Sequence, residues 1–203
     1  MARAARPDDT PDLPRSLDPD ATWIAVRAAD AQSVVKALGL RTVLPASWRG
    51  GLAAVRSEGV FVAPCVAGWV LAVGCDLAER TRDSSQLESL LPALSEEFEV
   101  ACWFTSHTER DVHGWALAER GSLVRGYGYS EEHGHIYWYG DVTEVERELG
   151  CFVDDPRDRS DDDVKWWPDA RIVQAIASAW SLDPGALEQS RTKAEATGWV
   201  GRL

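Results

Sequence analysis

The alternation of apolar and polar residues predicts a chain of short strands and short helices. Apolar runs of strand length, bounded by turn-forming residues, are typical of β-strands. Such runs occupy residues 22–27, 42–44, 60–62, 68–74, 100–105, 112–118, 123–130 and 135–139. The last four follow one another closely, and Gly121-Ser122 suits a tight turn between two of them. We therefore expect an antiparallel meander in the C-terminal half.

Helices are predicted where apolar residues recur every three or four positions behind a capping residue. The clearest begins at Ser85-Gln-Leu-Glu88, which reads as a capping box, and continues with an apolar stripe at 87, 90, 91, 94 and 98. Thr143-Glu-Val-Glu146 predicts a second capping box for a short helix that ends at Gly150. Further helix starts are expected near Asp30, Ser47, Pro168 and Asp183.

Strands and helices in this order predict an α+β fold with a mixed, mainly antiparallel sheet covered by a few helices. We expect one domain over residues 21–190. Residues 1–20, with three prolines among Asp and Arg, predict a disordered N-terminal tail, and residues 191–203 a C-terminal tail. Within the domain, residues 154–163 are nearly all Asp, Arg and Ser, which predicts a solvated acidic loop.

The charge balance narrows the class of partner. Asp and Glu number 33 against 21 Lys and Arg, a formal charge of −12, which disfavours nucleic-acid binding because that requires clustered cations. No apolar run approaches the roughly 20 residues of a membrane span, and the N-terminus has no apolar signal core. Four widely spaced cysteines without a CxxC motif suggest reduced thiols. These features together favour a cytoplasmic protein.

Four histidines are the main candidates for a metal site or a catalytic site. His107, His113, His133 and His135 could converge as a metal site or as the centre of a His/carboxylate hydrolase. Their spacing does not match one helical face, however, and no GxSxG motif is present. Gly126-Tyr-Gly128 lacks the third glycine of a dinucleotide fingerprint. We therefore predict neither catalytic residues nor a cofactor and retain the histidines only as an alternative.

Aromatic and acidic residues offer a second kind of site. Seven aromatic side chains lie on the predicted meander, and two interpretations stay open: cross-strand packing, or an exposed patch that binds another protein. The candidate interface residues are Trp115, Arg125, Tyr127, Tyr129, Trp138, Asp161, Asp162, Asp163, Trp166 and Trp167. The acidic members would attract a basic partner by complementary charge.

The size, the acidity, the many tryptophans and the closing Trp180-Ser-Leu-Asp-Pro184 resemble small acidic immunity proteins and related accessory proteins of bacteria. This resemblance, over residues 21–190, implies a non-catalytic protein-binding module that blocks a basic protein such as a toxin. Two alternatives remain: a hydrolase that uses the histidines between 107 and 135, and a structural subunit of a larger assembly.

Overall fold

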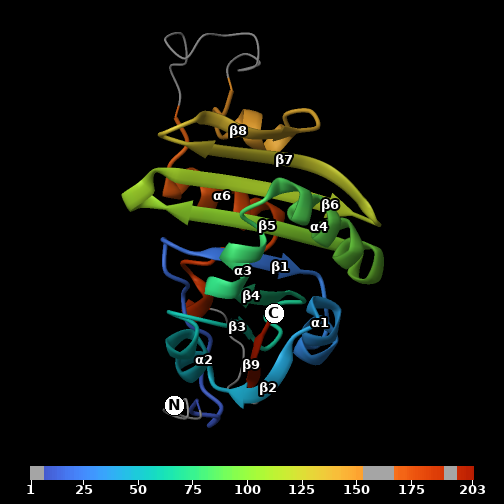
Figure 1. The fold of residues 1–203 in the computed structure, drawn as a ribbon, viewed down its shortest axis with the longest axis vertical. Helices are drawn as coiled ribbons and strands as arrows, with labels where there is room; N and C mark the ends of the chain where they lie inside the picture. Colours follow the sequence, from blue (N-terminus) through green and yellow to red (C-terminus); the bar gives the residue numbers. More distant parts are fainter. Residues whose placement is uncertain (1–6, 153–166, 190–195) are drawn as a thin grey trace.

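The computed structural model describes residues 7–152, 167–189 and 196–203, and its centre is one open sheet (Figure 1). In the described residues the strand order is β2-β9-β3-β4-β1-β5-β6-β7-β8, and every neighbouring pair is antiparallel. The strands are β1 (Thr22–Val26), β2 (Arg41–Ala46), β3 (Val60–Val62), β4 (Val70–Val73), β5 (Val100–His107), β6 (Val112–Glu119), β7 (Ser122–Ser130), β8 (Gly134–Tyr139) and β9 (Gly198–Arg202). The predicted α+β fold is confirmed. The sheet was predicted to be mixed and mainly antiparallel, and all pairs among the described strands are antiparallel.

Helices cover both faces of this sheet. They are α1 (Ala31–Leu38), α2 (Trp48–Ala54), α3 (Cys75–Arg80), α4 (Ser84–Phe98), α5 (Glu144–Glu148) and α6 (Ala170–Trp180), with short 3-10 turns at Thr108–Arg110 and Leu187–Gln189. Buried residues of α1, α3 and α4 share one hydrophobic cluster, whereas α2 and α6 contribute to the other. We name the two sides the α4 face and the α6 face. Because both are covered, every residue of β1 is buried.

Local sequence signals account for most helix boundaries. Asp30 caps α1 by accepting from the Ser33 amide, and Gly39 ends that helix with a φ of 71°. Ser47 caps α2, and the capping box of Thr143 and Glu146 begins α5. The predicted start of α4 is wrong, because Asp83 is the cap and accepts from the Ser85 amide. α3 was not predicted from the sequence.

Both ends of the chain differ from the expected tails. β9 lies inside the sheet between β2 and β3, although residues 191–203 were predicted to form a tail. The N-terminal segment from residue 7 packs on the domain, since the Asp12 carboxylate accepts from the amides of Trp48 and Arg49 at 2.6 and 3.0 Å. Leu17 in the same segment is buried. Backbone pairing and helix capping therefore order segments whose composition suggested disorder.

Two smaller points concern the C-terminal half. The buried stripe of α6 consists of Val173, Ile176 and Ala177. The acidic loop predicted over residues 154–163 lies outside the described residues.

No helix in the described ranges has the length and apolar character needed to cross a membrane.

Candidate functional site

Most of the meander's aromatic residues pack against one another on the α6 face. Trp115 and Tyr127 are directly paired across β6 and β7, with ring centroids 4.6 Å apart. Tyr127 also meets Trp138 and Phe152 edge-on. Trp115 and Tyr127 are fully buried, which makes the cross-strand packing interpretation correct for this pair. They are not part of any surface that a partner could touch.

Arg125, another predicted interface residue, is also fully buried, in an ion pair with Glu146. The Arg125 Nε atom donates to Glu146 Oε1 at 2.8 Å, and Trp115 Nε1 donates to the same oxygen at 2.7 Å. The guanidinium lies 4.3 Å from the Trp138 ring centroid, in cation–π contact. Because its charge is matched inside the fold, Arg125 has a structural role instead of the interface role predicted for it.

The remaining candidate interface residues divide between buried and exposed positions. Tyr129 is buried and Trp138 is half-buried. Trp167 is 48% exposed and its ring lies 5.4 Å from that of Tyr129. Asp161, Asp162, Asp163 and Trp166 lie outside the described residues. Among the described candidates, Trp167 alone thus has a largely solvent-facing side chain.

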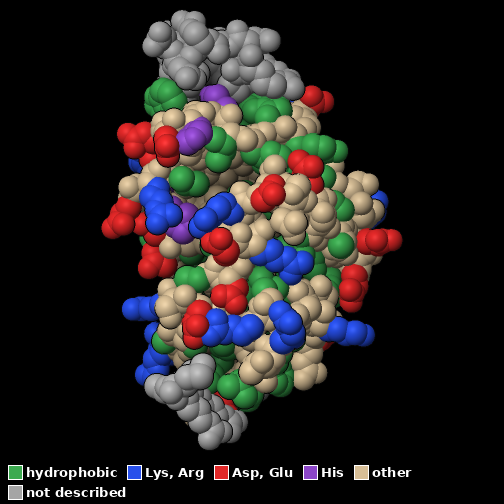
Figure 2. All heavy atoms as spheres, in the orientation of Figure 1, with side chains coloured by type: hydrophobic (Ala, Val, Ile, Leu, Met, Phe, Trp, Pro, Cys, Tyr) green, Lys and Arg blue, Asp and Glu red, His purple; other side chains and the backbone are tan. Residues whose placement is uncertain are grey.

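A different set of apolar residues is exposed at the β8 end of the sheet. Val124 on β7 and Ile136 and Tyr139 on β8 are 41%, 53% and 43% exposed. We call these three residues the β7–β8 patch. Figure 2, which views the α4 face, shows hydrophobic side chains reaching the surface near this end, with acidic side chains on either side. These residues were not predicted from the sequence, because an exposed apolar side chain on a strand has the same sequence signal as a buried one.

Three of the four histidines line one large cavity on the α4 face. The cavity has a volume of about 1110 Å³ and is lined by residues of α3, α4, β1, β5, β6, β7 and β8. His107, His113 and His133 line it, although the His113 ring bonds Ser106 on the α6 face. His135 also points to the α6 face, where it bonds Tyr127. We call this space the histidine cavity. Its further lining residues include Asp20, Thr22, Thr81, Trp103, Thr105, Glu109, Arg110, Glu132 and Tyr137.

His107 is held by hydroxyl groups in the base of the histidine cavity. Its Nε2 lies 3.3 Å from Thr22 Oγ1, which lies 2.7 Å from Thr105 Oγ1. Burial lowers the pKa of His107 below its usual 6.5, and the nearby Asp20 carboxylate opposes that shift. Desolvation is the largest contribution because the ring is partly buried while Asp20 remains exposed. His107 is therefore a neutral hydrogen-bonding group at pH 7.

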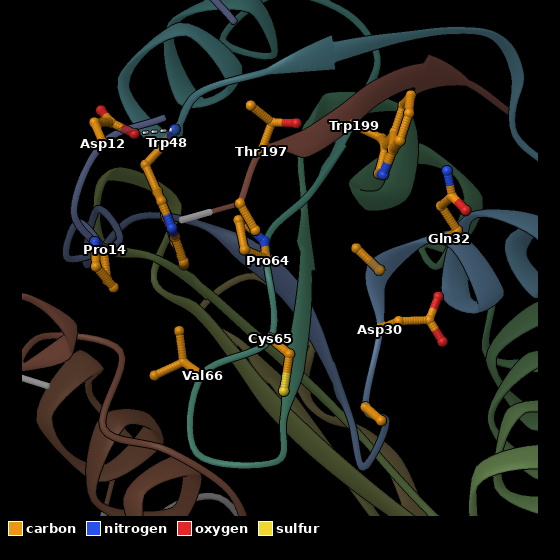
Figure 3. A pocket seen from close by; sticks show the side chains of 13 residues that line it. Asp12, Pro14, Asp30, Gln32, Trp48, Pro64, Cys65, Val66, Thr197 and Trp199 are labelled. Carbon is orange, nitrogen blue, oxygen red and sulfur yellow. Dashed lines mark hydrogen bonds between the residues drawn. The ribbon is translucent and has the colours of Figure 1, made fainter. Parts of the chain in front are cut away.

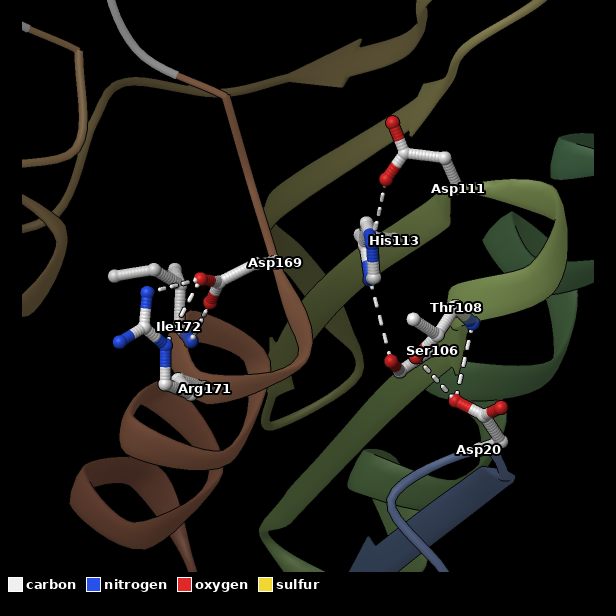
Figure 4. A network of polar contacts seen from close by, with 8 residues as sticks. All are labelled: Asp20, Ser106, Thr108, Asp111, His113, Asp169, Arg171 and Ile172. Atoms are coloured by element: carbon white, nitrogen blue, oxygen red, sulfur yellow. Dashed lines mark hydrogen bonds and ion pairs between the residues drawn. The ribbon is translucent and has the colours of Figure 1, made fainter.

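Ser106, His113 and Asp111 form a line with the residue types of a catalytic triad (Figure 4). His113 Nδ1 lies 3.2 Å from Ser106 Oγ, and His113 Nε2 lies 3.0 Å from the Asp111 carboxylate. Ser106 is buried and does not line the cavity, since it points to the α6 face from β5. A nucleophile must meet its substrate, and the Ser106 hydroxyl is buried in this structure. The contacts of His113 with Ser106 and Asp111 connect the start of β6 to β5 and to the preceding turn.

The histidines also do not gather around a metal position. Within the described ranges, no group of three or more His, Cys, Asp or Glu side chains is arranged to hold a metal ion. The metal-site alternative for His107, His113, His133 and His135 thus has no geometric basis there. The physical reason is that these histidines occupy different strand ends and both faces of the sheet.

A second cavity lies between the N-terminal segment and β9, with a volume of about 530 Å³ (Figure 3). Cys65, Trp48 and Trp199 line it together with Asp12 and Asp30. Both carboxylates are already used, because Asp12 binds the amides that begin α2 and Asp30 caps α1. The second cavity therefore has no free acid–base pair.

No protein-family model matches the chain significantly, and no curated protein or solved structure does either.

Proposed function

We propose that the protein is a non-catalytic binding module that engages a basic protein through the β7–β8 patch. One observation carries this proposal. Six large hydrophobic side chains in the described residues are exposed, and four of them lie on or against the two outermost strands β7 and β8. These four are Val124, Ile136, Tyr139 and Trp167. They are concentrated at one end of the sheet, with Ile136 on the α4 face and Trp167 against Tyr129 on the α6 face. Such a concentration of exposed apolar residues favours an interaction site more than scattered residues do.

The charge around the β7–β8 patch sets the chemistry of the partner. Between residues 121 and 152 the exposed carboxylates outnumber the exposed arginines by five to one. They are Glu131, Glu132, Asp141, Glu144 and Glu148, against Arg147. An apolar centre with an acidic rim favours a partner that is apolar at its centre and cationic around it.

The position of β8 supports the same conclusion. β8 is the last strand in the sheet order of the described residues, so the patch lies at a sheet edge, where contact with another chain meets little obstruction. The resemblance to small acidic immunity proteins makes inhibition of a basic toxin the specific form of the proposal. A hydrolase receives no comparable support, since Ser106 is buried.

Site-specific photo-crosslinking tests the proposal. A photoreactive amino acid at position 139 and, as control, at position 44 would be used in lysate of the source organism. Leu44 suits the control because it is 40% exposed but lies on β2, at the opposite end of the sheet. We expect position 139 to capture a basic protein that position 44 does not. That protein, once purified, should bind more weakly as salt is raised from 50 to 300 mM NaCl, because salt screens the acidic rim.

Variants then decide whether the patch is responsible. The pair Val124→Ser and Tyr139→Ser should weaken binding at least tenfold, whereas Leu44→Ser should leave it unchanged. Three results would reject the proposal: equal capture at both positions, a complex insensitive to salt and to the patch variants, or crosslinking of the protein only to itself. Self-crosslinking would instead support a structural subunit of an assembly.

A further inference from the structure

The base of the histidine cavity consists of small or hydroxylated side chains in one row across the sheet. Thr22 pairs with Thr105 across β1 and β5, Thr105 pairs with Gly114 on β6, and Gly114 pairs with Gly128 on β7. The row ends at Tyr137, which pairs with Gly128. Thr22, Thr105, Gly128 and Tyr137 of this row line the cavity, whereas Gly114 lies beneath the Trp103 ring.

The glycines also leave room for two aromatic rings. A Cβ at Gly114 would lie 3.1 Å from the Trp103 ring, and a Cβ at Gly126 would lie 2.4 Å from the Tyr137 ring. Glycines inside strands commonly mark such close approaches. Trp103 and Tyr137 both line the cavity, and so the glycines let it have aromatic walls beside a polar base.

The base of the cavity carries no net charge, whereas its rim carries both signs. Thr22, Thr81 and Thr105 are buried there. The ionised lining residues are all exposed at the rim: Asp20, Glu79, Arg82, Glu109, Arg110 and Glu132. Arg82 is already paired with Glu79 at 2.7 Å. An ionic group placed in the base would lose its hydration without gaining a counter-charge, which is unfavourable.

The hydroxyls in the base keep hydrogen-bonding capacity. Each threonine hydroxyl has one donor and two acceptor positions. Thr105 Oγ1 shares one hydrogen bond with Thr22 Oγ1. Because Thr105 also lines the cavity, its remaining donor or acceptor positions are available to a ligand there. A ligand that offers several neutral donors and acceptors, and an apolar face for the aromatic walls, matches this base.

We propose that the histidine cavity binds a carbohydrate of one or two sugar units. Sugars combine uncharged hydroxyl edges with C–H faces that pack on aromatic rings, and the cavity volume of about 1110 Å³ accommodates them. This site meets the β7–β8 patch at Ile136, which lines the cavity, but Val124 and Tyr139, on which the test of the proposed function relies, do not line it.

Ligand-observed NMR on the full chain tests this site. The probes are the common hexoses, pentoses and N-acetylhexosamines and their disaccharides, with phosphate, citrate and spermidine as charged comparison compounds. We expect saturation transfer to at least one sugar and none to the charged compounds. Amide shifts in labelled protein should centre on Thr105, Gly128 and Tyr137. Thr105→Val removes one hydroxyl at nearly constant volume and should weaken sugar binding at least tenfold.

Ser106→Ala is the matched control, because Ser106 neighbours Thr105 on β5 but points to the other face of the sheet. Thermal melts would establish that both variants fold. Retained sugar binding in Ser106→Ala supports the site. Absence of any sugar signal, binding of phosphate or spermidine in its place, or equal loss in the two variants would overturn the proposal. A failure here leaves the crosslinking result at position 139 unaffected, so the two proposals fail separately.

Discussion

Arg125 and Glu146 illustrate how a single buried pair organises the outer part of the sheet. Glu146 belongs to α5, where its carboxylate also accepts from the Thr143 amide at 2.6 Å, and Arg125 belongs to β7. Arg125 Nη1 donates in addition to the carbonyl of Tyr139 on β8. One ion pair therefore ties β7, β8 and α5 together, and its two charges compensate each other away from water.

Removing one partner of this pair should be costly. Arg125→Met leaves Glu146 as an uncompensated buried carboxylate, so we expect a loss of about 3–5 kcal/mol in the free energy of unfolding. Urea titration would measure it. The double variant Arg125→Met with Glu146→Gln should recover part of that loss. A single variant as stable as the native protein would show that the pair does not form.

His107 makes the stability of the protein depend on pH. Its pKa is lowered by burial, with Arg110 and His113 adding to the shift and Asp20 opposing it, so the unfolded chain binds the proton more readily. The contribution of His107 is complete above pH 6.5 and is lost as the pH falls through the lower folded-state pKa.

We therefore expect the native protein to lose stability on acidification below pH 6.5, and His107→Gln to make this dependence shallower. Thermal melts between pH 5 and pH 8 would measure the difference. An unchanged slope in His107→Gln would contradict the described burial of its ring.

Helices show what local sequence decides at the scale of an element. The caps at Asp30, Ser47 and Thr143 could be identified from the sequence, because a cap involves only residues two or three positions apart. The start of α4 could not be identified in this way. The helix begins at Ser84, one residue before the apparent capping box, and the Asp83 side chain accepts a hydrogen bond from the Ser85 amide. Two overlapping cap signals differ by little in local energy.

Alanine substitution distinguishes the two caps of α4. Asp83→Ala removes the side chain that accepts from the Ser85 amide, and we expect the Tm to fall by a few degrees. Ser85→Ala should change the Tm much less, because that side chain lies inside the first turn. Differential scanning calorimetry of both variants would decide. A larger fall for Ser85→Ala would restore the capping box at Ser85 and Glu88.

At the scale of the whole molecule, β9 connects β2 to the rest of the sheet. It pairs with β2 on one side and β3 on the other, although Gly198 follows the ends of these strands, Ala46 and Val62, by 152 and 136 residues. Gly198 is required at its start, because a Cβ there would lie 2.4 Å from the Val62 carbonyl and 2.6 Å from the Phe61 ring. Without β9, both neighbouring strands would expose unpaired edges.

Gly198→Val should therefore destabilise the fold strongly while keeping the chain length unchanged, and deletion of residues 196–203 should have at least the same effect. We expect a lower urea midpoint and aggregation on heating, measured by circular dichroism and light scattering. Thr197→Val, one residue before the strand begins, serves as the control. If deletion of residues 196–203 left the melting temperature unchanged, these residues would be a tail after all.

The sequence by itself determined the local elements: the strands of the meander, the caps of three helices, the buried stripe of α4 and the α+β class. These depend on contacts between residues close in the chain. Only the tertiary structure decided which faces of the strands are covered. It buried Trp115, Arg125 and Tyr127, left Val124 and Tyr139 exposed, brought three histidines to one cavity and inserted β9 into the sheet. The physical reason is that exposure and convergence depend on packing between segments distant in sequence, which alternation along one strand does not encode.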